Sequence, residues 1–337
     1  MNEPLAPSES RPTTDPLPRS NGSADAAPAP SDLTTLAPAL EEIAVLRSAV
    51  RQRAQRILGV LAVVWVIGAA MAFALSGSFV PVAVIGVVAS GITWFVGMAG
   101  PSEAYRLAFK ARVIGVLVAD QYQDAVYRAV GGIGQAEFEA SRLYQQGIDR
   151  YSTEDLIEAR LGETPFRMAE IHAEYKTTST DGKGHTTTHW HTIFKGRFLV
   201  ALFSKRFHGR TLVLSEAWRL FGMSGLEKVA LEDPDFEKLF AVYASDQVEA
   251  RYILSPSLME RLVACRRRMD AQVQAAFVDD HVILALPDAQ NRFEPPSAWS
   301  SGPLLSEADI QAYAADIALA AELIDELNLN RRIWDRG

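Results

Sequence analysis

Residues 57–75, ILGVLAVVWVIGAAMAFAL, and residues 79–99, FVPVAVIGVVASGITWFVGMA, contain no charged side chain. The first run has 19 residues and the second has 21. A helix of the shorter length spans about 28 Å, close to the hydrocarbon thickness of a bilayer, about 30 Å. Only residues 76–78 separate the two runs. The sequence therefore predicts a transmembrane hairpin of two antiparallel helices.

The charges that flank this hairpin predict its orientation. The connecting loop has no basic residue. Basic residues precede the first run (Arg47, Arg51, Arg53 and Arg56) and follow the second (Arg106, Lys110 and Arg112). By the positive-inside rule, both ends then face the cytoplasm. A signal peptide is the competing interpretation, since residues 72–74 (Ala-Phe-Ala) resemble a cleavage site. An apolar stretch that begins at residue 57 starts too late in the chain for that role.

The interior of the hairpin bears on its function. Neither run contains Asp, Glu, Lys, Arg or His, the residues that mark ion and proton pathways in membranes, so a transporter or channel is disfavoured. Small residues recur at a spacing of four in Gly68-x-x-x-Ala72 and Gly86-x-x-x-Ser90. Such positions let helices approach closely, and we expect packing within the hairpin to use them.

The whole-chain composition excludes other classes of function. Lys and Arg number 33 against 41 Asp and Glu, which gives a net charge of -8 and argues against nucleic acid as a partner. The single Cys265 cannot form a disulfide within the chain, which fits a reducing compartment. We expect this cysteine to pack as a small apolar residue.

The chain divides into three parts. Residues 1–38 hold 8 of the 17 prolines and no aromatic residue, which predicts a disordered tail. Residues 39–100 comprise a short helix and the hairpin, with spans at 57–75 and 79–99. Residues 101–337 form the predicted cytoplasmic domain.

Hydrophobic periodicity predicts the elements of this domain. A helical pattern runs from Ser102 to about Val130, and the capping-box-like Ser152-x-x-Asp155 opens another predicted helix at Thr153–Leu161. The period then changes to two, which indicates strands at Phe166–Thr178 and Thr186–Phe194 around a turn at 181–184.

The remainder of the domain mixes both periods. The predicted elements are strands at 198–203 and 211–214, helices at 234–243 and 256–269, a hairpin of 273–278 with 282–286, and a helix at 307–327. No regular alternation of strand and helix appears. The predicted fold class is α+β, with a mainly antiparallel sheet.

Three consecutive motifs resemble a known family. They are Phe236–Tyr243 (FEKLFAVY), Asp246–Tyr252 (DQVEARY) and Leu254–Arg261 (LSPSLMER). Together with Phe194-Lys195-Gly196 they are similar to the bacterial family called domain of unknown function 3137, over roughly residues 100–335. The resemblance implies a hairpin-anchored protein of the bacterial inner (cytoplasmic) membrane, encoded in many genomes beside a LemA-type membrane protein. It implies no activity, cofactor or catalytic residue.

The histidine-rich segment His185–His191 is the strongest candidate for chemistry. If Gly182 and Lys183 form a two-residue turn, Glu174 lies opposite His191, and His172 lies diagonal to it. With His189 on the same face, these side chains could bind zinc or a similar divalent ion. The alternative is a solvated polar face with no metal.

A second candidate group comprises Asp246, Glu249 and Arg251, which precede a predicted helix. Convergent carboxylates at such a position could serve as general acid and base. The alternative is an ion-paired structural junction, which we favour because two residues of the group would share one strand face.

Two hypotheses about function follow. The first is a non-catalytic, membrane-associated scaffold that binds a protein partner, such as a LemA-type protein, or the bilayer. The second is a membrane-attached, metal-dependent hydrolase that uses the histidine hairpin. The sequence contains no phosphate-binding glycine loop, paired cysteine motif or serine nucleophile elbow, so no other cofactor is predicted.

Overall fold

The computed structural model describes residues 33–76, 80–122, 124–203, 206–215, 225–300 and 302–328. Most of the predicted disordered tail, residues 1–32, lies outside these ranges, as do residues 77–79 of the hairpin connection. Helix α1 (Leu33–Ser76) begins before the predicted end of the tail and continues without a break through the first apolar run.

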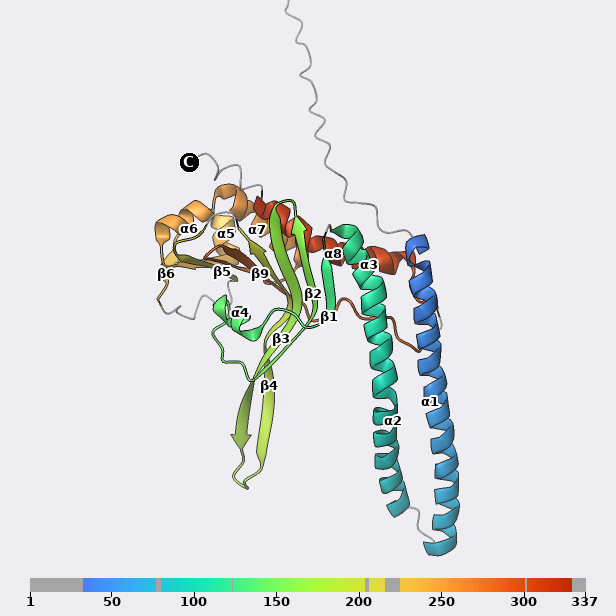
Figure 1. Cartoon of the computed structure of the whole chain (residues 1–337). Coiled ribbons are helices and arrows are strands. Elements are labelled where there is room, and N and C mark those ends of the chain that lie inside the picture. The colour runs from blue at the N-terminus through green and yellow to red at the C-terminus, as the bar shows by residue number, and fades with distance from the viewer. Residues whose placement is uncertain are drawn as a thin grey trace, which may run out of the picture.

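The second apolar run belongs to a helix that continues into the globular domain. Helix α2 (Val80–Phe109) is followed directly by one π-helical segment, η1 (Lys110–Ile114), and by α3 (Gly115–Gln121). Figure 1 shows α1 and α2 side by side, projecting away from the sheet. The domain is therefore joined to the hairpin by continuous helix.

Both hairpin helices are long and apolar enough to span a membrane, with mean hydropathies of 2.5 and 1.8 in their most apolar windows. Only 6% of each window is buried, so neither is the core helix of a soluble domain. Phe73 and Phe95 are 85% and 76% exposed. Exposed apolar surface of this extent is typical of a contact with a membrane or another protein.

Small residues hold the hairpin together, as the sequence predicts. The indole Nε1 of Trp65 donates a hydrogen bond to Ser90 Oγ at 3.0 Å. A Cβ atom at Gly86 would lie 2.8 Å from the Trp65 ring. The second small-residue motif therefore accommodates Trp65 from the other helix.

One antiparallel sheet organises the domain, in the order β1-β2-β3-β4-β9-β8-β5-β7-β6. Its strands are β1 (Val126–Val130), β2 (Arg150–Leu161), β3 (Thr164–Thr180), β4 (Thr186–Leu202), β5 (Arg210–Ser215), β6 (Glu227–Val229), β7 (Phe240–Ala244), β8 (Gln274–Val278) and β9 (His281–Pro287). The predicted α+β class with mainly antiparallel pairing is confirmed.

Helices cover the two faces of the sheet unequally. The remaining helices are α4 (Gln135–Ala140), α5 (Pro234–Leu239), α6 (Gln247–Ile253), α7 (Pro256–Met269) and α8 (Glu307–Asn328). Figure 1 shows α4 on the opposite side of the sheet from α7 and α8. The larger core lies beneath α3, α7 and α8, and it extends along α1 to Ala54. A smaller core surrounds Phe138 of α4.

Four sequence predictions of secondary structure were wrong. The strands predicted separately at 186–194 and 198–203 form the single strand β4. Residues 153–161 form part of strand β2, because pairing with both β1 and β3 outweighs a helix-like local pattern. The predicted helix 234–243 ends at Leu239, and the apolar run after it is the buried strand β7. The helix predicted to reach Val130 ends at Gln121, and residues 126–130 form the edge strand β1.

Candidate functional site

A fully buried lysine lies where the long apolar helix α2 enters the domain. Lys110, the first residue of the π-helical segment, is 0% exposed. Its Nζ lies 2.6 Å from Asp155 Oδ2, 3.0 Å from Glu154 Oε2 and 2.9 Å from Glu294 Oε1. π-Helical turns often occur at functional sites, so the groups around Lys110 are a candidate site.

A bulge in strand β2 presents two neighbouring acids to this lysine. The pairing of β2 with β3 shifts between Glu154 and Ile157, and Asp155 has a φ of 59°. Regular strand geometry would direct Glu154 and Asp155 to opposite faces, whereas a bulge can turn both toward the same helix. Tyr127 of β1 donates a further hydrogen bond to Asp155 Oδ1.

Arg106, one turn earlier on the same helix, completes the cationic side of the cluster. Its guanidinium donates to Glu154 at 2.8 Å and to Glu103 at 2.8 Å, and it lies 3.6 Å from Glu294. Asn291 donates to the other oxygen of Glu154 at 3.2 Å. We call Arg106, Lys110, Glu154, Asp155, Glu170 and Glu294 the junction cluster, because they join the apolar helix α2 to the sheet and to the segment after β9.

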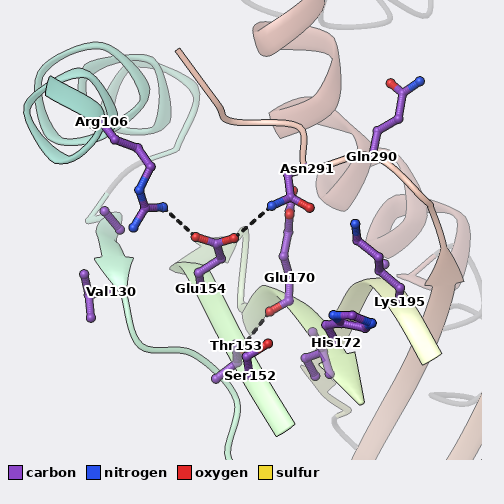
Figure 2. Close-up of a pocket in the computed structure, with 13 residues that line it drawn as sticks. Arg106, Val130, Ser152, Thr153, Glu154, Glu170, His172, Lys195, Gln290 and Asn291 are labelled. Carbon is purple, nitrogen blue, oxygen red and sulfur yellow. Dashed lines mark hydrogen bonds and ion pairs between the residues drawn. The ribbon is translucent and has the colours of Figure 1, made fainter. Parts of the chain in front are cut away.

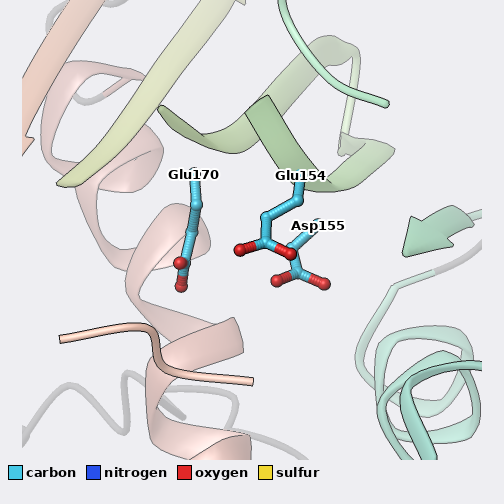
Figure 3. Close-up of side chains that lie close together, drawn as sticks. All are labelled: Glu154, Asp155 and Glu170. Atoms are coloured by element: carbon cyan, nitrogen blue, oxygen red, sulfur yellow. The ribbon is translucent and has the colours of Figure 1, made fainter. Parts of the chain in front are cut away.

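Glu170 of β3 is the carboxyl group of the cluster with the most altered acidity. Burial raises the pKa of Glu170 to about 7, with Asp155 and Glu154 acting in the same direction. A hydrogen bond of 2.9 Å from the Arg292 backbone N–H to Glu170 Oε1 opposes this rise. Figure 3 shows its carboxyl group beside those of Glu154 and Asp155.

The buried lysine remains charged. Burial lowers the pKa of Lys110, but the carboxylates of Asp155, Glu294 and Glu154 outweigh burial, and the net shift is upward. For Glu154, burial is likewise outweighed, by Lys110 and Arg106, and its pKa is lowered. Lys110 and Glu154 are therefore ionised at neutral pH.

Three carboxyl groups of the junction cluster have ligand atoms within 4.8 Å of one another: Glu154, Asp155 and Glu170. Oxygen ligands of this kind suit Mg²⁺ or Ca²⁺. The Lys110 ammonium, however, already lies within 3.0 Å of two of them, where it would repel a divalent ion. Lys110 itself supplies the central cation, and the arrangement fits an internal ion cluster better than a metal centre.

A cavity of about 340 Å³ opens beside the junction cluster. In Figure 2, Arg106 lies beside Glu154, and Glu170 lies between Glu154 and the basic side chains His172 and Lys195. The remaining lining residues are Ala129, Val130, Ser152, Thr153, Ile171, Gly196, Gln290 and Asn291. The lining therefore combines the acidic Glu154 and Glu170 with basic side chains (Arg106, His172 and Lys195) and apolar ones.

The predicted metal ligands do not come together as one set. The β3–β4 turn contains five unpaired residues rather than two, so Tyr175, not Glu174, pairs with His191. A slip of one residue moves a side chain to the other face of a strand, and the predicted Glu174–His191 pairing was wrong. His191 stacks on Tyr175 instead, with ring centroids 4.8 Å apart.

Two of the four predicted ligands, His172 and Glu174, lie near one another. His172 Nε2 lies 3.6 Å from Glu174 Oε1, and Arg150 donates to Glu174 Oε2 at 2.5 Å. His189, which is exposed, pairs with Thr177 nearer the turn that joins β3 to β4. Zinc binding by any of these residues stays a prediction, and the geometry provides no shared site for all four.

Asp246, Glu249 and Arg251 have separate structural contacts. Asp246 caps helix α6 by accepting from the backbone N–H groups of Val248 and Glu249. The Glu249 carboxylate accepts from the backbone N–H groups of residues 208 and 209, at 2.8 and 2.7 Å. Arg251 is exposed and donates to Gln247 at 3.4 Å. The three side chains do not converge on a substrate position.

A family model described as "Protein of unknown function (DUF3137)" matches residues 192–329. Residues 192–329 belong to the DUF3137 family. The DUF3137 region runs from the second half of β4 to the end of α8 and includes Glu294 and Asn291. Lys110, Glu154 and Glu170 precede it, so the junction cluster connects the DUF3137 region to the apolar helix α2.

Other comparisons add little to the family assignment. No match was found among curated proteins. The crystal structure of the mycobacterial trehalose monomycolate transport factor A, TtfA, aligns with 62% of this chain and 94% of its own, at 8% identity and a TM-score of 0.32. A similarity at that TM-score supports no inference about the fold or function of this chain.

The junction cluster was missed by the sequence analysis, which interpreted Arg106 and Lys110 only as charges flanking the membrane. One signal was available. Lys110 lies three and seven residues before Val113 and Leu117 of the apolar helix face, so a charged side chain occupies a core-facing position. Its acidic partners are more than 40 residues away in sequence, and nothing local identifies them.

Proposed function

We propose that this chain is a non-catalytic, membrane-anchored interaction module whose β3–β4 ribbon binds a protein partner. The hairpin of α1 and α2 would cross the inner membrane of a bacterial cell, with both termini and the α+β domain in the cytoplasm. The uncharged interior of the spans and the basic residues at their cytoplasmic ends support this orientation.

The far end of the β3–β4 pair, residues 176–190, supports this proposal, and we call it the β3–β4 ribbon. All residues from Lys176 to Trp190 are exposed. Strand β2 pairs with β3 only up to Glu174, and β9 pairs with β4 only from Gly196. Among the described residues, no third strand pairs with β3 after Glu174 or with β4 before Gly196. Open strand edges of this kind can accept a strand from a partner.

The direction and composition of the ribbon indicate the kind of partner. Figure 1 shows the ribbon projecting from the sheet in the same direction as the hairpin of α1 and α2. Its exposed residues are mostly Thr, Ser, Gly, Lys and His, which suit a polar surface rather than the bilayer interior. We infer a membrane protein with a polar cytoplasmic surface, and the LemA-type protein implied by the family resemblance is the first candidate.

Site-specific photocrosslinking in native membranes tests this proposal. A photoreactive residue in place of Thr188, on the ribbon, should yield a discrete crosslinked membrane protein. The same residue in place of Val248, which is 76% exposed on α6, serves as the matched control. Crosslinks that are absent at Thr188, or identical at both positions, would contradict the proposal.

The metal-dependent hydrolase is the weaker candidate, because His189 and His191 do not share one site with His172 and Glu174. Elemental analysis of the purified full chain discriminates between the two functions. A stoichiometric transition metal that is lost on replacing His189 and His191 with Ala would favour the hydrolase over the interaction module.

A further inference from the structure

The segment between β9 and α8 passes across the two membrane helices, as Figure 1 shows. Tyr105 of α2 donates its hydroxyl to the Pro296 carbonyl at 2.9 Å. Arg51 of α1 donates to the Ala298 carbonyl at 2.5 Å, and Arg47 donates to the Gly302 carbonyl at 3.1 Å. Side chains from both helices therefore hold this segment against the hairpin.

This attachment places Trp299 beside an apolar span. The ring of Trp299 stacks on that of Trp94, with centroids 6.3 Å apart and an interplanar angle of 21°. Trp94 belongs to the uncharged run 79–99. Trp299 is nevertheless 53% exposed, so about half of this aromatic side chain has no protein cover.

The level of Trp94 and Trp299 along the hairpin follows from the packing of α1 against α2. Arg53 Nε of α1 donates to the Gly97 carbonyl of α2 at 2.9 Å, so the last charged turns of α1 lie level with Gly97. Trp94 lies three residues, or about one helical turn, deeper than Gly97. Trp94 and Trp299 are therefore located where charged side chains give way to the apolar span.

We propose that Trp299 and its neighbours Ser297 and Ala298 form a second membrane contact, which inserts into the interface on the domain side of the bilayer. This inference rests on the membrane anchoring proposed above. Tryptophan favours the interface because its large ring is apolar and its N–H needs a polar partner. Exposed Arg53 and Arg56 at this level complement anionic lipid headgroups.

The consequence concerns the orientation of the domain. The hairpin alone leaves the domain free to tilt with the helices. Because the segment that carries Trp299 leads directly into α8, its insertion would hold the core beneath α8 at a fixed height above the lipid.

Fluorescence quenching by spin-labelled lipid tests the proposal on the full chain. Cys265 is replaced by Ala, and one new cysteine carries an environment-sensitive fluorophore at Ser297, which is exposed and leaves Trp299 intact. The protein is reconstituted into vesicles of phosphatidylethanolamine and phosphatidylglycerol that contain lipid spin-labelled near the headgroup. We expect the label at position 297 to lose most of its fluorescence, and the same label at Val248 to lose none.

A third labelled position separates the two levels of the proposal. A label at Phe95, in the middle of the exposed span surface, reports insertion of the hairpin through quenching by lipid that is spin-labelled deep in the acyl chains. Quenching at Phe95 with none at Ser297 would overturn the second contact alone. Absence of quenching at both positions would overturn the membrane anchoring as well.

Discussion

Lys110 and Asp155 form an ion pair that is completely enclosed by protein, with Nζ 2.6 Å from Oδ2 and both side chains 0% exposed. One partner belongs to the helix that leaves the apolar span and the other to the sheet. A buried pair of this kind contributes little net stability, but removal of one partner is costly. The pair therefore favours one fixed attachment of the helix to the domain.

Replacement of Lys110 by Met should strongly destabilise the domain. The substitution leaves Glu154, Asp155 and Glu294 without their common cation, and loss of one partner of a buried ion pair costs about 3–5 kcal/mol. The free energy of unfolding, from urea titration of the detergent-solubilised chain, measures the effect. Arg112→Met is the control, because the Arg112–Glu42 pair is exposed and contributes roughly 0–1 kcal/mol.

The double variant Lys110→Met/Asp155→Asn should be more stable than the sum of its single changes predicts. Removing both charges avoids an unpaired buried carboxylate, while Asn tolerates the positive φ that Asp155 adopts. A double-mutant cycle in urea measures this coupling. Strictly additive losses would show that the two side chains do not interact in the folded protein.

Protonation of Glu170 should make stability fall as pH rises. Burial raises the pKa of Glu170 from 4.5 to about 7, so between these values the folded chain binds a proton that the unfolded chain has lost. The contribution of this proton to the free energy of unfolding is fully present below about pH 4.5 and is lost by about pH 7. Its total is about 3 kcal/mol.

The variant Glu170→Gln isolates this contribution, because Gln resembles the protonated acid and cannot titrate. Its free energy of unfolding should exceed that of the wild type above pH 7, and the difference should shrink toward pH 4.5. The matched control is Glu163→Gln, in an exposed turn. Parallel pH profiles for the wild type and Glu170→Gln would contradict the assignment.

Gly196 should tolerate no side chain. It has a φ of 150°, and an added Cβ would lie 2.2 Å from the Leu286 carbonyl oxygen and 2.6 Å from the Asp288 nitrogen. Because both are backbone atoms, Gly196→Ala must separate β4 from β9. We expect the free energy of unfolding to fall by more than about 2 kcal/mol. Gly182→Ala, where the added atom would meet nothing within 4 Å, should leave the unfolding midpoint unchanged.

The register of the ribbon predicts which cysteine pairs can form a disulfide. Thr178 pairs with Thr188, whereas the two-residue turn expected from the sequence would pair Thr178 with Thr187. In a Cys265→Ala chain, cysteines at 178 and 188 should crosslink under mild oxidation, since directly paired strand positions lie within disulfide reach. Preferential crosslinking of 178 with 187 would show that the register is wrong. Mobility on a nonreducing gel reports the outcome.

Sequence patterns predicted the parts of the fold that depend on local physics. The two apolar runs predicted the hairpin, because length and the absence of charge define a span. The helix 256–269 was predicted with the observed ends, since Ser255 caps it and Pro256 occupies its first turn. The antiparallel class followed from period-two runs separated by short turns.

The junction cluster could not be predicted, because it depends on contacts between distant segments. Ser152-x-x-Asp155 resembles a helix start, yet Asp155 occupies a bulge that brings it to Lys110, 45 residues earlier. The metal hypothesis failed to assemble one site for a related reason. Turn length sets strand register, and an error of one residue moves His191 to the face opposite Glu174.

The continuous helix and the junction cluster hold the domain and the α1–α2 hairpin together as one body. Pulsed electron paramagnetic resonance between spin labels at Val84, near the far end of α2, and at Val248, on α6, tests this attachment in vesicles with Cys265 replaced by Ala. We predict one narrow distance distribution, which broadens in Lys110→Met. A broad distribution in the chain with an intact junction cluster would contradict the claim.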